Sequence, residues 1–362
     1  MLGTNRVLFA VALGTTIALG CGGGANTTGT TGTGGRGGEG GGTTSTSSTG
    51  GSGGEMTTTG TGGALTCLPG EGTVLAGTKL IFGEGNSGQW KKVGYNLDGL
   101  VSTAGSKDLC QPAEGAFTLT PYPDGEDGID NSFGKNLLPQ IIALYPTWVT
   151  DINNGMNNGF FDVLLQLNCL PPTGDVPVMV TKLYGGTALG SMPKFDGTDK
   201  WPVAPELLLN PMDPQSSAIV FNKSSVIGSA FDSGKGETFI ITVPINTMTA
   251  STSIKLTLYA AQTKMTLAAD RKSATGGMIG GVLNTEEFVA ELKKVGTLLE
   301  LCDSPLFAGL ITQVRQSSDI MADGTQDPTK TCDGISMGLG FEMKEVQIGE
   351  VGPKTPVGVP CP

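Results

Sequence analysis

Histidine is absent from the 362 residues of the chain. Its absence excludes catalytic sets built on an imidazole base, such as Ser-His-Asp and Cys-His, and every metal site with a histidine ligand. Basic residues are also few, since 22 Lys and Arg stand against 33 Asp and Glu and the net charge is -11. Phosphate recognition depends on clustered Lys and Arg, so this balance argues against nucleic acid as a partner.

Familiar catalytic and cofactor motifs are missing as well. The sequence contains no Walker phosphate loop. It also lacks a CxxC pair, which makes a zinc ribbon or thioredoxin-type redox chemistry a poor expectation. Candidate functional residues therefore have to be argued one by one from composition and spacing.

The apolar run near the N-terminus is too short for a membrane-spanning helix, which needs about 20 residues. It extends from Val7 to Leu19, has 13 residues, follows the positive charge of Arg6 and ends in small residues. These features are typical of the apolar region of a signal peptide. We therefore expect residues 1–20 to be a signal peptide.

The end of this run, Ile17-Ala18-Leu19-Gly20-Cys21, resembles the lipobox of bacterial lipoproteins. The resemblance implies that the Cys21 thiol receives a diacylglycerol, that the chain is cut before Cys21, and that the new amino terminus is acylated. The lipid bilayer would then be a partner of the protein through Cys21. In Gram-negative lipoproteins, an aspartate directly after the lipidated cysteine favours retention in the inner membrane. Gly22 occupies this position here, so the resemblance implies that the protein can reach the outer membrane. The alternative is ordinary secretion with Cys21 incidental.

The segment after Cys21 is nearly free of apolar side chains. Of the 42 residues from 22 to 63, 36 are Gly, Thr or Ser. Such a segment cannot bury enough surface to offset its conformational entropy, so it predicts a disordered spacer. We expect 21–66 to hold the lipidated cysteine and this linker, and 67–362 to form one folded domain.

A lipobox, a Gly/Thr/Ser tether and a cysteine-bearing β-rich domain together resemble the surface lipoproteins of myxobacteria. The resemblance implies a lipid-anchored, extracytoplasmic protein at the outer membrane or cell surface. It implies no particular activity, because most proteins of that kind have none assigned.

Six cysteines remain once Cys21 is set aside, and an even number in an exported chain indicates disulfides. We predict that Cys302 pairs with Cys332, because the loop after the predicted helix at 304–314 is long enough to return to the helix start. Pairing of either one with Cys169 or Cys361 stays open. The other four cysteines have no predicted partners: Cys67, Cys110, Cys169 and Cys361.

Residues 67–362 show the period-two alternation of strands in several segments. Examples are 163–167, 176–180, 241–245 and a pair at 254–260 and 264–269 that predicts a hairpin with its turn at 261–263. Helical spacing occurs at 135–144, 284–299 and 304–314. Long runs of strands with a few inserted helices predict a mainly β fold, a jelly-roll-like β-sandwich with two or three inserted helices, preceded by the disordered tether.

An acidic loop is the one candidate metal site. Asp124, Glu126, Asp127 and Asp130 lie within seven residues, with Gly125 and Gly128 between them. Calcium takes six to eight hard oxygen ligands, which flexible Asp-rich loops supply, so the loop is a possible calcium site and calcium a possible cofactor. The alternative is an acidic surface turn in which Asp130 or Asn131 caps the following helix.

Two further sets of side chains are candidates for binding or hydrolysing a glycan. Sugars stack on aromatic rings and hydrogen-bond to Asp and Asn, which makes Trp90, Tyr95, Asn96 and Asp98 a candidate cluster; packing in the core is the alternative. A glycosidase would need two carboxylates about 5–9.5 Å apart. The available side chains carry no motif, and a solvated surface explains them equally well: Asp98, Asp162, Asp196, Asp199 and Glu237.

The sequence therefore favours a membrane-anchored extracytoplasmic lipoprotein with a non-catalytic binding or structural role at the cell envelope. Its partner beyond the bilayer would be a glycan or an envelope protein. The alternative is a glycan-binding or glycan-hydrolysing β-sandwich protein, and the sequence identifies no catalytic residue.

Overall fold

The computed structural model describes residues 72–362, apart from 85–87, 116–122, 247–250 and 355. The predicted signal peptide, Cys21, the tether and Cys67 lie outside these residues, so the expectations about them stay predictions. The described residues all belong to one compact unit. None of the helices described is both long enough and apolar enough to cross a membrane.

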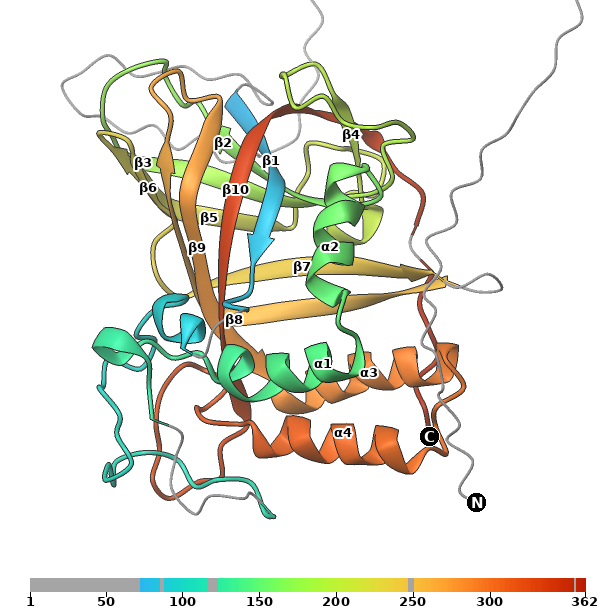
Figure 1. The fold of residues 1–362 in the computed structure, drawn as a ribbon. Helices are drawn as coiled ribbons and strands as arrows, with labels where there is room; N and C mark the ends of the chain where they lie inside the picture. The colour runs from blue at the N-terminus through green and yellow to red at the C-terminus, as the bar shows by residue number, and fades with distance from the viewer. Residues whose placement is uncertain (1–71, 85–87, 116–122, 247–250, 355) are drawn as a thin grey trace, which may run out of the picture. The chain divides into compact units, whose positions relative to one another are not determined.

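The predicted mainly β class with inserted helices is confirmed (Figure 1). Ten strands form one sheet, and eight of them pair in a ring in which every neighbouring pair is antiparallel. The strands belong to one large sheet that closes on itself, so the main core lies inside a single curved sheet and not between two separate sheets. In ring order the strands are β1 (Gly72–Ile81), β2 (Asp162–Asn168), β3 (Val176–Gly186), β5 (Ile219–Ile227), β6 (Ala230–Asp232), β8 (Ser251–Leu267), β9 (Ser273–Asn284) and β10 (Gly334–Val351).

Two strands lie off the ring. β7 (Glu237–Asn246) pairs with the first part of β8, and the two extend together beyond the ring (Figure 1). β4 (Lys200–Val203) runs parallel to the last part of β10. The ring itself closes where β1, the first described strand, pairs with β10, the last, with Val74 opposite Val346.

The predicted hairpin at 254–269 is wrong, because these residues form the single strand β8. The pairing of β8 with β9 shifts between Tyr259 and Gln262, beside Ala260, whose φ is 48°. An extra residue in a strand reverses which face the following side chains occupy. The change of phase in the sequence therefore marks a bulge within one strand, and 261–263 is not a turn.

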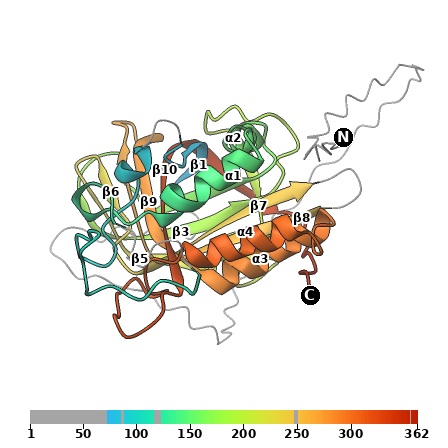
Figure 2. The same cartoon turned by 60° about the horizontal axis from the view of Figure 1, so that its bottom comes forward.

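Four α-helices are inserted between the strands (Figures 1 and 2). Of the three predicted helices, the one at 284–299 is best matched, since Asn284 Oδ1 accepts hydrogen bonds from the backbone N–H groups of Glu286 and Glu287. The helix α3 (Thr285–Leu298) packs on β8 and on α4 (Pro305–Gln316), which lies beside it. The helices are α1 (Leu138–Leu144), α2 (Trp148–Asn157), α3 (Thr285–Leu298) and α4 (Pro305–Gln316).

The helix α2 was not predicted, although its buried residues Ile152 and Met156 have helical spacing.

Short helical turns complete the described structure. A π-helical turn, Phe133–Leu137, leads into α1. The 3-10 turns are Gln89–Lys92, Glu126–Gly128 and Pro205–Leu207.

The apolar residues form two cores on opposite faces of β1. Leu75 belongs to the main core, which the ring, α1 to α4 and their connections enclose. Val74 and Ala76 point the other way, into a smaller cluster with Tyr184 and Trp201 beneath the segment that carries β4. Alternate side chains of a strand face opposite sides, so β1 is buried on both faces.

The predicted Cys302–Cys332 disulfide is wrong. The structure pairs Cys110 with Cys332 and Cys302 with Cys361. α4 has 12 residues, about 18 Å at 1.5 Å per residue, and the chain stays near its C-terminal end, where Ile320 bridges to Gly334. Cys332 therefore lies at the opposite end of α4 from Cys302.

The two bonds tie loops and tail to the sheet region. Cys110–Cys332 spans 222 residues and links the loop after β1 to the start of β10. Cys302–Cys361 fastens the C-terminal tail beside α3, where Cys361 N–H also donates to the Lys293 carbonyl. Cys169 is disulfide-bonded as well.

Candidate functional site

The acidic loop divides into an inward and an outward pair. Asp130 is buried and Asp124 is half-buried, and their carboxyl groups hydrogen-bond to each other. Glu126 and Asp127 are exposed, and Glu126 forms an ion pair with Lys92. The four predicted calcium ligands therefore do not converge. Across the described residues no group of three or more Asp, Glu, Cys or His side chains is arranged to hold a metal ion.

The alternative, a surface turn with a capping side chain, is met only in part: Asn131 accepts a hydrogen bond from the following helical turn, but it is buried and the cap position is Ser132. Asn131 Oδ1 accepts from the N–H of Gly134, in the turn that leads to α1, and from the N–H of Gly338 on β10. Its Nδ2 donates to the carbonyls of Trp90 and Val93. One buried amide thus joins the acidic loop, the segment after β1 and the middle of β10.

Asp130 fastens the acidic loop to the 95–102 segment. Its backbone N–H donates to the Tyr95 carbonyl over 3.0 Å, and its Oδ2 accepts from the Leu97 N–H over 2.7 Å. Asp124 repeats the pattern farther along, since its Oδ2 accepts from the Ser102 N–H and its own N–H donates to the Ser102 carbonyl. The two carboxyls thus lie side by side between the same two segments.

A third aspartate joins these segments to the start of β10. Asp319 accepts hydrogen bonds from the N–H and the hydroxyl of Ser336. The same hydroxyl oxygen accepts from the N–H of Ser132, at 2.8 Å. Ser336 therefore lies between Asp319 and the end of the acidic loop.

Asp98 completes a group of four aspartates. Its Oδ2 accepts from Gln326 Nε2 over 2.9 Å, and this amide also donates to the Asp319 carbonyl. Gln326 Oε1 accepts from the N–H of Cys110, beside the Cys110–Cys332 disulfide. We call Asp98, Asp124, Asp130 and Asp319 the aspartate cluster.

Burial and mutual repulsion raise the pKa values within the aspartate cluster. Burial, with repulsion from Asp98 and Asp319, raises the pKa of Asp130 to about 9. Burial also raises the pKa of Asp319 to about 7 and that of Asp124 above its usual range. Asp130 therefore carries its proton at neutral pH, which allows it to donate to the Asp124 carboxylate.

A lysine faces the aspartate cluster from the turn before α1. Lys135 Nζ donates to the Pro123 carbonyl and lies 5.1 Å from the centre of the Trp90 ring. Its burial lowers its pKa, against the attraction of Asp319 and Asp124. The cavity between these groups has about 10 Å³, room for about one water molecule, and is lined by Trp90, Pro123, Asp124, Asn131, Ser132, Lys135 and Asp319.

Shifted pKa values in a cleft mark candidate catalytic groups, but this cavity is too small for a sugar. The predicted stacking cluster does not form a platform either. The Tyr95 hydroxyl donates to the Met278 carbonyl, Asn96 donates to the Leu100 carbonyl, and Trp90 lies under Lys135. We therefore assign this region no glycan-binding or catalytic role.

Core packing accounts for three other large aromatic residues. Trp201 and Tyr184 are fully buried in the smaller core, and Trp148 packs on Phe82. Of the other candidate carboxylates, Asp162 is buried, and its Oδ1 accepts from the N–H of Gly77, where the pairing of β1 with β10 is irregular. These residues explain the fold without a ligand.

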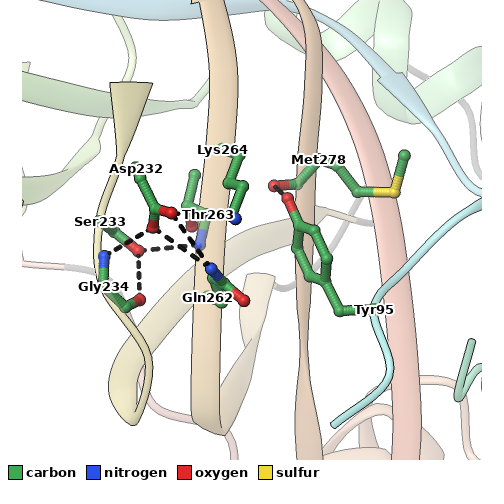
Figure 3. A network of polar contacts seen from close by, with 8 residues as sticks. All are labelled: Tyr95, Asp232, Ser233, Gly234, Gln262, Thr263, Lys264 and Met278. Carbon is green, nitrogen blue, oxygen red and sulfur yellow. Dashed lines mark hydrogen bonds and ion pairs between the residues drawn. The ribbon is translucent and has the colours of Figure 1, made fainter. Parts of the chain in front are cut away.

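A second polar network lies at strands β6, β8 and β9 (Figure 3). Asp232 forms a 3.0 Å ion pair with Lys264 and accepts from Gln262 Nε2 and Gly234 N–H. Burial raises the pKa of Asp232, but the hydrogen bonds and the Lys264 charge outweigh it and lower the pKa overall. Ser233 accepts from the Thr263 N–H beside them.

A cavity of about 290 Å³ lies where residues of β1, β2 and the last part of β10 meet two loops. Gln166 on β2 forms one wall; its Oε1 accepts from the Tyr184 hydroxyl and its Nε2 donates to Gln215. Sequence reasoning missed this cavity, because its polar residues come from distant segments. The lining residues are Gly72, Val74, Gln166, Gly197, Gln215, Glu345, Val346, Gln347 and Ile348.

The segments that flank this cavity are anchored to the sheet. The carbonyl of Gln215 accepts from Lys182 Nζ over 2.8 Å. Gln347 Nε2 donates to the Gly197 carbonyl, and the Gly197 N–H donates to the Glu345 carbonyl. Lys272 pairs with Glu345 at 2.9 Å. The polar rim is therefore held in place in the absence of a ligand.

The comparisons with known proteins add no relative. The chain matches no family model, no curated protein and no solved structure.

Proposed function

We propose that the protein is a lipid-anchored, extracytoplasmic lipoprotein with a non-catalytic binding or structural role at the cell envelope. Residues 17–21 support the anchor, and the Gly/Thr/Ser segment supports a spacer between bilayer and domain. The Cys110–Cys332 and Cys302–Cys361 disulfides support an oxidising compartment, where such bonds form and persist. The outer membrane or the cell surface is the proposed location.

The cavity at Gln166 and Gln215 is the observation that carries a binding role. Its volume of about 290 Å³ is close to the lower limit of about 300 Å³ for ligand pockets. Amide and carboxylate groups line its rim above the aliphatic side chains of Val74, Val346 and Ile348. Such a site suits a small, neutral ligand with several hydrogen-bonding groups.

A glycan is the second candidate, and the amide-rich rim is what favours it. Gln side chains offer both a donor and an acceptor, which is what the hydroxyl groups of a sugar require. The ligand would then be the terminal residue of a glycan on the cell surface. Hydrolysis is not part of the proposal, because the two carboxyls that share a cavity, those of Asp124 and Asp319, border a volume of only about 10 Å³.

The anchor is tested with Cys21→Ser in the full chain. We expect the wild type to label with radioactive palmitate and to enter the detergent phase, and the variant to lose both properties. A Cys67→Ser variant is the control, since it removes a different cysteine. A variant at Cys21 that is labelled and partitions like the wild type would show that the anchor lies elsewhere.

The binding role is tested on a glycan array with the full chain in detergent. We expect binding to a restricted set of glycans, and at least a tenfold loss with Gln215→Ala, about 1.4 kcal/mol. Gln140→Ala, on the exposed side of α1, is the matched control. Binding that survives Gln215→Ala would remove the cavity from the proposal, and a silent array would favour the structural role.

A further inference from the structure

The aspartate cluster joins three parts of the chain that are far apart in sequence. Asp98 belongs to the segment after β1, Asp124 and Asp130 to the acidic loop, and Asp319 to the connection between α4 and β10. Their carboxyls accept hydrogen bonds across these segments, from Leu97, Ser102, Ser336 and Gln326. The segments themselves contain little regular structure, so these bonds hold much of the interface together.

The charges that face one another in this interface are mostly negative. Asp130 faces Asp98, Asp124 and Asp319, which come from all three segments. Lys135 faces Asp124 and Asp319 from the turn before α1, with Lys91 near it. Other groups in contact with the carboxyls are neutral: Ser102, Ser336 and Gln326. A fully ionised cluster would place four negative charges against this lysine.

We propose that the aspartate cluster is a proton-dependent latch, which holds the 95–102 segment and the acidic loop against the start of β10 and loosens when its shared protons leave. The hydrogen bond between Asp124 and Asp130 is the central contact, because it exists only while one of the two carries a proton. Without that proton the pair becomes two adjacent carboxylates, and their repulsion separates the segments they hold.

The direction of the pH effect follows from the raised pKa values. A carboxyl whose pKa is raised by folding binds its proton more tightly in the folded state. Its contribution is therefore fully present at acidic pH and is lost as pH rises, up to about 7 for Asp319 and about 9 for Asp130. Over the pH range in which a carboxyl of the cluster holds its proton in the folded state but not in the unfolded state, the folding equilibrium constant falls close to tenfold per pH unit for each such carboxyl.

The test follows thermal unfolding of the full chain in detergent from pH 5 to pH 10, together with amide exchange by mass spectrometry. We expect the midpoint to fall as pH rises, and protection of peptides from 95–102 and 123–132 to fall before that of β9. Asp130→Asn keeps the shape and donates permanently to Asp124, so it should abolish most of the fall above pH 7. Exchange rates are corrected for their intrinsic dependence on pH.

Two further variants keep the test decisive. Asp124→Asn is the second latch variant: it removes one of the charges that raise the pKa of Asp130, so the fall with pH should be shallower than in the wild type, and this holds even if Asp130→Asn fails to fold. Asp199→Asn is the matched control, since Asp199 also accepts two backbone N–H bonds but lies outside the aspartate cluster. A wild-type profile that stays level to pH 9, or latch variants with the slope of the control, would overturn the proposal.

Discussion

Two polar networks of this protein contain a buried or half-buried aspartate, and they shift the pKa of that aspartate in opposite directions. At β6 and β8, Asp232 has Lys264 at 3.0 Å, and its pKa is lowered. In the aspartate cluster, Asp130 has three other aspartates as charged neighbours, and burial with their repulsion raises its pKa to about 9. The extent of burial, together with the sign of the neighbouring charges, thus decides whether the site holds a carboxylate or a carboxylic acid.

The comparison implies that acid affects the two networks in opposite directions. The depressed pKa of Asp232 means that its contribution to folding is present above its usual pKa and is lost as pH falls. The raised pKa of Asp130 means that its contribution is lost as pH rises. The overall dependence on pH is the sum of both, and variants at either site separate them.

The largest effect is expected from Asn131→Asp, which adds a fifth carboxyl at the centre of the negative region. The Asn131 amide donates to Trp90 and Val93 carbonyls, and an ionised carboxylate would face both of these acceptors. We expect a loss of about 3 kcal/mol or more at pH 7, because buried acceptors lose their donor and a charge is added.

The measurement is denaturant unfolding at pH 7 and pH 4.5. The loss should be smaller at pH 4.5, where the new carboxyl carries a proton and can donate. Asn153→Asp, on α2 and away from the aspartate cluster, is the control. Equal losses at both pH values would show that geometry and not charge governs this position.

A smaller effect is expected when the cation that faces the aspartate cluster is removed. Lys135→Met keeps the length and apolar stem of the side chain but leaves Asp124 and Asp319 without its positive charge. We expect a loss of about 1 kcal/mol at pH 8 and a steeper decline of stability with pH. A melting profile parallel to that of the wild type would show that Lys135 does not offset the cluster.

The smallest effect is expected at the second network. Asp232→Asn removes the ion pair with Lys264, whose side chain is 49% exposed, so solvent screening limits the loss to about 0.5 kcal/mol at pH 7. The loss should shrink as pH falls below the usual pKa of an aspartate, because the unfolded state then takes up a proton that the ionised Asp232 of the folded state does not. Thermal unfolding at pH 7 and pH 3 measures it, and a stabilising effect at pH 7 would contradict the assigned role.

Local signals in the sequence predicted many elements correctly. Asn284 caps α3 and Pro305 begins α4, since caps and first-turn prolines act on neighbouring backbone groups. Alternation identified β2, β3 and β7, because strand faces repeat every second residue. The phase change near Ala260 was visible too, but a bulge and a turn produce the same pattern.

The candidate site was only partly accessible from the sequence. The run from Asp124 to Asp130 stands out as acidic, yet its chemistry depends on Asp98 and Asp319, which lie far from it in the chain. The cavity beside Gln166 has no sequence signal at all, since isolated glutamines are ordinary surface residues. Local periodicity carries no information about such long-range neighbours.

By itself the sequence determined the class of the fold and the ends of two helices, because strand alternation, helix caps and prolines act over a few residues. The tertiary structure decided the closure of β1 on β10, the partner of Cys332, and the gathering of the aspartate cluster. Those outcomes join residues that are far apart in the chain, as the 222 residues between Cys110 and Cys332 illustrate. They depend on which surfaces pack together, and packing also supplies the burial that keeps a proton on Asp130.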